Sequence, residues 1–512
     1  MPEPDETERP YDVTAPAPMQ DLNWNSARAR AFGERMLNLW EELLAELPDL
    51  PVARQEGEEG VRAAVTLPIP DEPLSDDDLV AHLREIVFAH STYIGNPRFL
   101  AYISGAGTVP GAAAELLAAG LNPNLRGWLL APAATEIELH LGRWFARQFG
   151  LPERAGGLMV TGGAMANFVG LKTARDAQSG WRTRREGLAG LPSLTLYCSD
   201  QAHAVIERAA DMLGLGSQAV RKIPVDSDWR MRLDVLHERI ESDSAAGAKP
   251  LAIIGTAGTT ATGAIDSLDA LADLCREYGL WFHVDAAYGG PAVLTDDLRP
   301  LFKGIERADS IAFDPHKWLY APRAAGCLLI RDLQLLADAF AVQPTYIYQD
   351  RERTDRGIDL GLLGPEFTRS FLSFKVWVSL LAHGRAAYAR RIAHDAALAR
   401  YLGARVHERP DFELMTPVSL SICCFRYIPP DLSAMPGRDE YLDRLNERLM
   451  TAIQLDRRAF CSNAVLHGRF TLRVCIVNYR TEASDLDTLL GVAAELGARL
   501  DSELRGDWLS SQ

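Results

Sequence analysis

The chain has 512 residues, of which 47% are hydrophobic and 24% are charged, and its formal net charge is −16 at pH 7. This length predicts two or three structural units around a large core. The acidic balance argues against general nucleic-acid binding, although a local site can still accept a small anion. The seven cysteines have no C-x-x-C or metal-finger spacing, and we therefore expect reduced thiols.

Residues 1–20 are rich in Pro, Glu, Asp and Thr, and we expect a flexible tail. They contain neither the basic region nor the apolar region of a secretory signal. No stretch of the chain has the continuous apolar length that a bilayer requires. The sequence therefore predicts a cytoplasmic protein that does not bind membranes.

Two helices are predicted after the tail. An apolar stripe at helical spacing indicates a helix from Ser26 to Leu47, which a proline then stops. A second helix is predicted from Ser75, with Asp78 as its partner in a capping box. These two helices are too few to bury their stripes on each other. We expect residues 21–95 to form a helical arm that packs on another subunit.

Residues 96–383 alternate apolar runs with helical patterns, an order typical of a mostly parallel sheet covered on both faces. Ligands of such sheets gather beyond the carboxyl ends of the strands, so we expect the functional site there. The predicted strands are Gly157–Val160, Leu194–Cys198, Leu251–Gly255, Trp281–Val284, Ile311–Phe313 and Cys327–Ile330, and one predicted helix between them is Leu268–Tyr278.

Residues 384–512 predict a smaller α+β domain. Short strands are expected within 419–427 and 470–477. A last helix is expected from Ser484, with Asp487 as its capping partner.

Two predicted strands each lead to one charged residue, Asp285 and Lys317. Neither charge belongs at a buried strand end unless a ligand needs it there. A lysine that forms a Schiff base and a carboxylate for a ring nitrogen are what pyridoxal 5'-phosphate (PLP) requires. The alternatives are a surface lysine and, for His283 with Asp285, a metal-binding pair, for which we find no third ligand at suitable spacing.

Three other segments end predicted strands. The turn Thr161–Asn167 suits a phosphate at a helix start, and its alternative is a plain glycine turn. His203 suits stacking on an aromatic cofactor, and its alternative is a helix-capping or core histidine. Thr256 ends a further strand and supplies a hydroxyl at the same rim of the sheet.

Together, the segments 161–167, 199–203, 283–290 and 314–319 resemble the group II PLP-dependent amino-acid decarboxylases, which include aromatic-L-amino-acid decarboxylase and glutamate decarboxylase. The resemblance covers nearly the whole chain. It implies an α/β protein of PLP fold type I, like aspartate aminotransferase, with a mostly parallel seven-stranded sheet, an N-terminal helical arm and a small C-terminal α+β domain. It also implies a small-molecule amino-acid substrate and a homodimer with active sites at the interface.

The resemblance assigns roles to individual residues. Lys317 would form the Schiff base, Asp285 would contact the ring nitrogen and His203 would stack on the ring. The other cofactor-binding positions that it implies are Gly163, Ala164, Met165, Thr256, Ala287, Asp314 and His316. Asp314 departs from the family pattern, because many relatives carry Asn close to the phosphate and a carboxylate pointing inward would repel phosphate.

Tyr346 matches the tyrosine of a mobile loop that protonates the substrate α-carbon. Because Tyr346 and His203 are both present, we expect decarboxylation to the amine and CO2, through an external aldimine and a quinonoid, ahead of oxidative deamination to an aldehyde. The implied substrate-binding positions are Tyr102, Ile103, Arg126, Trp128, Phe367 and Arg473. Their aromatic members predict an aromatic or other bulky hydrophobic substrate. An acidic substrate, paired with Arg126, or an aliphatic one is the alternative.

Two other classes of function stay open at this point. A PLP aminotransferase would share Lys317 and Asp285, but it would transfer the amino group to a keto acid without making an amine. A scaffold protein with a decayed site would not form a Schiff base, and it would be colourless where a PLP enzyme is yellow.

Overall fold

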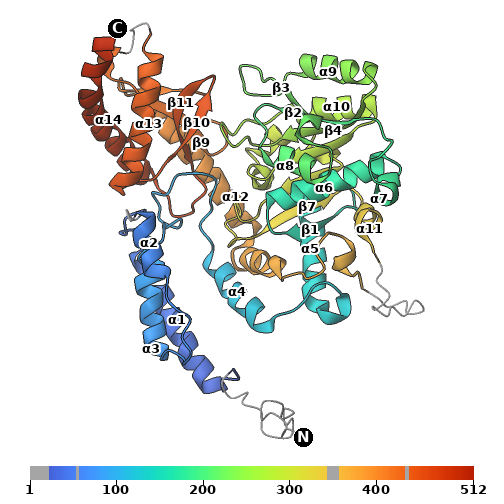
Figure 1. The fold of residues 1–512 in the computed structure, drawn as a ribbon, viewed down its shortest axis with the longest axis horizontal. Helices are drawn as coiled ribbons and strands as arrows, with labels where there is room; N and C mark the ends of the chain where they lie inside the picture. Colours follow the sequence, from blue (N-terminus) through green and yellow to red (C-terminus); the bar gives the residue numbers. More distant parts are fainter. Residues whose placement is uncertain (1–21, 54–56, 343–356, 433–436, 512) are drawn as a thin grey trace, which may run out of the picture. The chain divides into compact units, whose positions relative to one another are not determined.

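The computed structural model describes residues 22–53, 57–342, 357–432 and 437–511, without the side chains of 507 and 509–511. The chain divides into two compact units, Met1–Tyr93 and Ile94–Gln512. Figure 1 shows the helices and strands of each unit.

The N-terminal unit is helical. Its elements are α1 (Ser26–Glu46), α2 (Glu58–Val65) and α3 (Asp76–His82), which continues into the π-helical turn η2 (Leu83–Phe88). The predicted helix starts at Ser26 and Ser75 are confirmed, and Ser75 Oγ accepts a hydrogen bond of 3.1 Å from the Asp78 backbone N–H. Leu39 is buried, whereas Leu37 on the same helix is 48% exposed. The unit therefore leaves apolar surface uncovered.

The larger unit is built on a seven-stranded sheet with the order β1-β7-β6-β5-β4-β2-β3. Strands β3, β2, β4, β5 and β6 run parallel, while β7 is antiparallel to both of its neighbours. The mostly parallel seven-stranded sheet is thus confirmed. The strands are β1 (Gly156–Val160), β2 (Leu194–Ser199), β3 (Val220–Ile223), β4 (Lys249–Thr256), β5 (Trp281–Asp285), β6 (Ser310–Phe313) and β7 (Gly326–Ile330).

All six strands predicted in this region are present, and β3 is the one that the sequence pattern missed. Its four residues have only Val220 and Ile223 buried, because it lies at the edge of the sheet beside β2. Arg221 and Lys222 interrupt the apolar run that marks the central strands. A short edge strand therefore lacks the continuous hydrophobic signal of a strand buried on both faces.

Helices cover both faces of this sheet, and two separate apolar cores result. Successive residues of β4 point to opposite faces, so Ile253 belongs to one core and Ile254 to the other. Phe145 of α5 packs in the first core and Val169 of α6 in the second. The helices are α4 (Val109–Leu121), α5 (Pro132–Gln148), α6 (Gly163–Gln178), α7 (Arg182–Glu186), α8 (Val205–Met212), α9 (Leu233–Ala245), α10 (Leu268–Tyr278), α11 (Gln334–Phe340) and α12 (Leu372–His407).

The C-terminal region carries a four-stranded antiparallel sheet with the order β10-β11-β9-β8. Its apolar face packs against three long helices, α12, α13 and α14, in a third core. The expected small α+β region is therefore confirmed. Its elements are β8 (Phe412–Leu414), β9 (Ile422–Tyr427), α13 (Asp439–Asp456), β10 (Ser462–Leu466), β11 (Arg469–Cys475) and α14 (Ala483–Ser511).

The predicted capping box of the last helix is wrong. Helix α14 begins at Ala483, before Ser484, and the Asp485 carboxylate accepts from the Glu482 backbone N–H at 2.9 Å. The Asp487 carboxylate instead accepts a hydrogen bond from the Tyr401 hydroxyl on α12. The Asp487 side chain, which the local pattern assigned to the helix cap, is thus engaged in a tertiary contact instead.

All seven cysteines lie in the described part of the chain, where each is buried and unbridged. Across the described residues, no helix is both long enough and apolar enough to cross a bilayer.

Candidate active site

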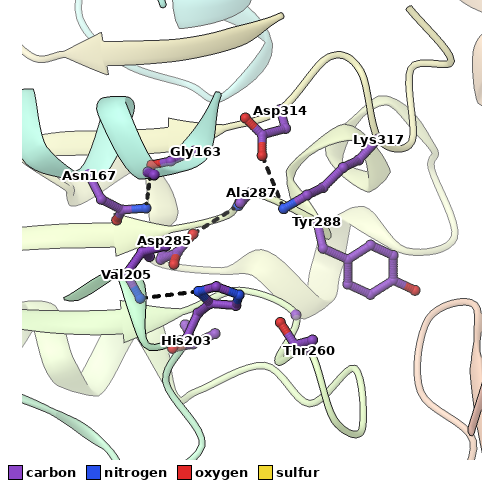
Figure 2. Close-up of a pocket in the computed structure, with 13 residues that line it drawn as sticks. Gly163, Asn167, His203, Val205, Thr260, Asp285, Ala287, Tyr288, Asp314 and Lys317 are labelled. Atoms are coloured by element: carbon purple, nitrogen blue, oxygen red, sulfur yellow. Dashed lines mark hydrogen bonds and ion pairs between the residues drawn. The ribbon is translucent and has the colours of Figure 1, made fainter. Parts of the chain in front are cut away.

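A cavity of about 170 Å³ lies at the carboxyl ends of β4 and β5, where the loop after β6 and the first turn of α6 also meet (Figure 2). Residues from five separate segments of the chain line it, as expected for a parallel sheet. They are Gly163, Ala164, Asn167, His203, Val205, Thr256, Gly258, Thr260, Asp285, Ala287, Tyr288, Asp314 and Lys317.

The first turn of α6 forms one wall. The Met165 and Ala166 backbone N–H groups both bond to the Gly162 carbonyl at 3.0 Å, and the preceding N–H groups of Gly163 and Ala164 lie at the free start of the helix. A Cβ atom on Gly163 would lie 2.8 Å from Asp314 Oδ2 and 3.3 Å from the Ala287 Cβ. The glycine therefore allows Asp314 and Ala287 to approach the start of α6, where a helix favours an anion.

Lys317 enters the cavity from the turn after β6. Its Nζ lies 3.0 Å from Asp314 Oδ2, and its side chain is 21% exposed. The turn is closed by a 2.9 Å hydrogen bond from the Lys317 backbone N–H to the Asp314 carbonyl. The alternative of a surface lysine does not describe this side chain, because it points to a buried carboxylate (Figure 2).

Asp285 ends β5 and faces the same cavity. It is buried, and its Oδ1 accepts a 3.1 Å hydrogen bond from the Ala287 backbone N–H. Burial raises the pKa of Asp285, and the nearby charge of Lys317 opposes that rise. The carboxyl group is therefore a stronger base than a solvated aspartate, and it faces a space rather than a fixed partner cation.

His203 lies on the side of the cavity opposite Lys317 (Figure 2). Its Nδ1 accepts a 3.1 Å hydrogen bond from the Val205 backbone N–H at the start of α8. Burial lowers the pKa of His203, which leaves the ring neutral at pH 7 with its proton on Nε2. The helix-capping alternative and a role toward a cofactor are therefore compatible, because Nδ1 caps the helix while Nε2 is left for the cavity.

His283 does not face the cavity. Its Nε2 bonds to Asn167 Oδ1 at 2.8 Å, and its Nδ1 bonds to Ser310 Oγ at 2.7 Å. Full burial lowers the pKa of His283 to about 3, so the ring is neutral. Asn167 in turn donates to the Gly163 carbonyl at 2.8 Å. Nε2 thus holds α6 against β5 and Nδ1 links β5 to β6, so neither ring nitrogen is left for a metal ion shared with Asp285.

Tyr288 is a lining residue to which the sequence assigned no role. Its ring stacks on Trp318, the neighbour of Lys317, at a centroid distance of 5.2 Å. Its hydroxyl bonds to Ser421 Oγ at 2.5 Å, on the loop before β9. The indole of Trp318 donates to the buried Asp395 of α12 at 3.0 Å. The sequence signal that could have identified Tyr288 is its position three residues after Asp285. Its stacking on Trp318 could not be predicted, because the two residues are distant in sequence.

Among the predicted cofactor-binding positions, Met165 and His316 do not line the cavity. The Met165 side chain packs against the apolar core under α6. His316 bonds through Nδ1 to the Ala325 carbonyl at 2.7 Å, and its Nε2 lies 3.9 Å from Asp314 Oδ2. His316 therefore stabilises the turn Asp314–Lys317 without facing the cavity.

The predicted substrate-binding positions also lie outside this cavity. The guanidinium of Arg126 covers the ring of Phe367 at 4.8 Å, and Trp128 donates through its indole to Glu136. In a second group, the Tyr102 backbone N–H and the Arg473 guanidinium both contact Ser462 Oγ. Ile103 packs in the first core. Tyr346 lies outside the described residues.

The sequence was compared with known protein families and with curated proteins. Residues 59–428 match the family model described as the pyridoxal-dependent decarboxylase conserved domain. The chain is 33% identical over 467 residues to an aromatic-L-amino-acid decarboxylase of Bacillus atrophaeus, covering 91% of this chain and 95% of that one. It is 28% identical over 460 residues to a phenylacetaldehyde synthase of Arabidopsis thaliana, covering 88% and 92%.

The fold was compared with solved structures. The crystal structure of Oryza sativa TDC with PLP and tryptamine matches with a TM-score of 0.87 at 27% identity, over 93% of this chain and 99% of that one. This match confirms the expected PLP fold type I architecture.

Proposed function

The chain belongs to the pyridoxal-dependent decarboxylase family, and we propose that it converts an L-amino acid with an aromatic side chain to the amine and CO2. The protein is a lyase that uses PLP as its cofactor. The observation that carries the proposal is one cavity that contains Lys317, Asp285, His203 and the first turn of α6.

The residues around the cavity fit this cofactor. Within the described part of the chain, two buried oxygen atoms at the cavity, Thr256 Oγ1 and Asp314 Oδ1, have no hydrogen-bond partner. A Cβ on Gly163 would clash with the Asp314 carboxylate, so the lining of the cavity approaches the start of α6 closely only because residue 163 is a glycine. Unpartnered buried oxygens and a glycine at the closest approach are expected where a polar ligand binds.

When bound, PLP supplies an aldehyde that joins a primary amine and a protonated ring that takes up the electron pair left by the departing carboxylate. We assign the aldehyde to Lys317, the ring nitrogen to Asp285 and the phosphate to the N–H groups at the start of α6. The remaining cofactor-binding positions in this proposal are Ala164, Met165, Thr256, Ala287, Asp314 and His316.

Asp285 and His203 would act on opposite parts of the ring. Because burial raises the pKa of Asp285, its carboxylate holds a proton on the ring nitrogen more firmly than a solvated aspartate would. His203 keeps its Nε2–H available, since Nδ1 is occupied by the Val205 backbone N–H. In this proposal Asp285 maintains the ring charge, while His203 holds the ring in place and keeps its Nε2–H free to donate a hydrogen bond.

Trp128 and Phe367 support an aromatic substrate, and so does the Bacillus atrophaeus relative. The Arg126 guanidinium covers the Phe367 ring, a contact that places a second aromatic group beside this arginine. Tyr102, Ile103 and Arg473 complete the proposed substrate-binding set. We therefore favour an aromatic amino acid over an acidic or aliphatic one.

A second candidate is decarboxylation with oxidative deamination to an aldehyde. The likeness to a phenylacetaldehyde synthase is the observation in its favour. The presence of both His203 and Tyr346 favours amine formation instead, and a product analysis separates the two.

We also propose a homodimer whose active sites are completed at the interface. An exposed apolar surface, which we call the α4 face, comprises Leu116 (64%), Leu117 (64%) and Leu121 (70%) on α4 with Leu129 (69%) and Leu130 (65%) on η3 (Trp128–Leu130). Several exposed leucines on two consecutive elements of the chain are typical of a protein interface. Of the proposed substrate residues, Trp128 is the first residue of η3, and Phe367 is 41% exposed. Both positions fit a substrate pocket that a second copy completes.

The proposed chain organisation is a tail (1–20), an arm that packs on the second subunit (21–95), a large PLP-binding domain (96–383) and a small domain (384–512). We further propose a cytoplasmic location.

The experiment that tests the function is incubation of the purified protein and PLP with each of the twenty amino acids. Amine, aldehyde and CO2 are measured together, and a keto acid is added in parallel to detect transamination. We expect an aromatic amino acid to yield equal amounts of amine and CO2. Aldehyde in place of amine would support the second candidate, and no CO2 from any amino acid would contradict both.

A further inference from the structure

We propose that Asp395 of α12 is a positioning residue that holds Lys317 where its amine meets the cofactor's aldehyde. It would do so through Trp318 and Tyr320, two residues that follow the lysine in the chain. The inference rests on the proposed function, in which Lys317 carries the cofactor. Asp395 does not line the cavity, so it acts on the reaction only through the segment that contains the lysine.

One oxygen of the Asp395 carboxylate accepts two hydrogen bonds. Oδ2 accepts from the Trp318 indole N–H at 3.0 Å and from the Tyr320 hydroxyl at 2.5 Å. Asp395 and Trp318 are fully buried, and Tyr320 is 2% exposed. Hydrogen bonds to an ionised acceptor are stronger than those between neutral groups. Removal of the carboxylate would therefore deprive two buried donors of the acceptor that they share.

The anchored side chains belong to the turn that follows Lys317. The Tyr320 backbone N–H donates to the Lys317 carbonyl at 3.3 Å. Tyr320 has a φ of 51°, in the left-handed region, which costs free energy for a residue other than glycine. Such a conformation persists only where the surrounding structure holds it. The bond from the Tyr320 hydroxyl to Asp395 is one restraint, and the bond from the Thr108 N–H to the Tyr320 carbonyl at 2.9 Å is another.

Trp318 connects the lysine to both the cavity wall and α12. Its ring stacks on Tyr288, which lines the cavity, and its indole N–H donates to Asp395. Lys317 and Trp318 are neighbours in the chain, but the lysine side chain lines the cavity while the tryptophan side chain packs in the first core. A movement of this segment that displaced Trp318 would therefore displace Lys317 as well.

Asp395 is itself held in place. Its Oδ1 is paired with Arg391 Nη2, one turn earlier on α12, at 2.8 Å. The same Nη2 donates to the carbonyls of Asn478 and Thr481 at 3.1 and 3.0 Å. Burial raises the pKa of Asp395 to about 7, although the charge of Arg391 opposes that rise. The carboxylate is therefore charged at pH 8.5, where the test is made.

The reaction that depends on this anchor is attachment of the cofactor. Lys317 Nζ forms a C=N bond with the aldehyde carbon, and the aldehyde oxygen leaves as water. A displacement of about 1 Å between reacting groups can cost about 10²-fold in rate. The phosphate and the ring nitrogen are assigned to the start of α6 and to Asp285, which belong to other segments. Loss of the anchor should therefore slow attachment and leave the preceding binding of the cofactor intact.

The test measures binding and attachment separately on the cofactor-free protein. Attachment of PLP is followed by absorbance, and hydride trapping with mass spectrometry locates it. Pyridoxine 5'-phosphate has an alcohol in place of the aldehyde, so it binds without attaching, and calorimetry gives its dissociation constant. In Asp395→Ala we expect attachment at residue 317 to slow by at least about tenfold, while the dissociation constant of pyridoxine 5'-phosphate changes by less than about twofold.

Tyr320→Phe tests the same contact if Asp395→Ala does not fold, because it removes one donor and keeps the aromatic ring. Attachment should slow by about threefold or more, again without a change in the affinity for pyridoxine 5'-phosphate. In the double variant, the second substitution should slow attachment by less than about twofold beyond Asp395→Ala, because the hydroxyl has already lost its acceptor.

Asp243→Ala and Tyr197→Phe are the matched controls. The Tyr197 hydroxyl donates to the buried Asp243 carboxylate at 3.0 Å, and that carboxylate pairs with Arg221, also at 3.0 Å. Asp243 and Tyr197 do not line the cavity. Both variants should keep the attachment rate and the affinity for pyridoxine 5'-phosphate of the natural protein within about twofold.

Unchanged attachment in Asp395→Ala and Tyr320→Phe overturns the inference. Equal losses of attachment rate and of affinity for pyridoxine 5'-phosphate also overturn it, as does an equal slowing in the controls, because each indicates a general loss of structure. The proposed function fails in a different way, since the natural protein would then carry no label at residue 317.

Discussion

The proposed cofactor cavity and the α4 face differ in how many of their side chains have partners within one chain. At the cavity, Asp285 and Lys317 are held by partners from the same chain, the Ala287 N–H and the Asp314 carboxylate. On the α4 face, Leu117 and Leu121 are 64% and 70% exposed. A single chain thus supplies the partners of the proposed catalytic residues, whereas the face proposed for a second copy stays uncovered. The two regions should therefore respond differently to substitution.

The largest effect is expected from Lys317→Ala. Removal of the amine abolishes covalent attachment of the cofactor, and decarboxylation should fall by at least about 10³-fold. Hydride trapping followed by mass spectrometry should place the cofactor label on residue 317 in the natural protein and remove it in the variant. Lys303→Ala is the control, since Lys303 is an exposed partner of Asp269, and it should keep both label and activity. A label on another lysine would contradict the assignment.

Asp285→Asn tests the second component of the cavity. An amide cannot hold a proton on the ring nitrogen, so the rate should fall by about 10²–10³-fold while covalent attachment at Lys317 is retained. The rate is measured in single turnovers and the attachment by absorbance. Full activity with unaltered absorbance would show that the ring nitrogen does not contact Asp285.

Leu117→Glu tests the α4 face without touching the cavity. A buried, unpaired carboxylate at an interface costs about 2 kcal/mol or more, which weakens the dimer by about 30-fold or more. Sedimentation at decreasing concentration measures the change. Leu455→Glu, at a 52% exposed leucine on α13, should leave the dimer intact. A natural protein that stays a folded, fully active monomer on dilution would refute the proposed interface.

Tyr346→Phe sharpens the assignment of reaction type. If the tyrosine hydroxyl protonates the α-carbon, its loss should raise aldehyde and ammonia relative to amine several-fold. The product ratio is measured with the preferred substrate by chromatography. An unchanged ratio would remove the proposed role of Tyr346.

The smallest effect is expected in the N-terminal unit. Ser75→Ala removes the side chain that caps α3, at a cost of about 1 kcal/mol in the stability of that helix. Hydrogen exchange of α3 amides should become faster. Ser75→Asp, which can still cap, should restore protection. Equal exchange in Ser75→Ala would show that the cap does not contribute.

The sequence indicated much of this fold because its signals are local. The central strands are buried on both faces, so continuous apolar runs such as Trp281–Val284 marked them directly. The charges of Asp285 and Lys317 at strand ends pointed to one rim of the sheet, and the structure brings them into one cavity. The cap of α3 was also predicted, because it depends only on Ser75 and a residue three positions later.

Contacts between residues distant in the chain could not be predicted from the sequence. The Asp487 side chain bonds to Tyr401 on another helix, His283 uses Asn167 and Ser310, and Tyr288 stacks on Trp318. Residue type and spacing by themselves determined which side chains we propose for the chemistry, because strand periodicity and burial are encoded by neighbouring residues. Only the tertiary structure decided which partners those side chains meet, because long-range packing sets distances that neighbouring residues do not encode.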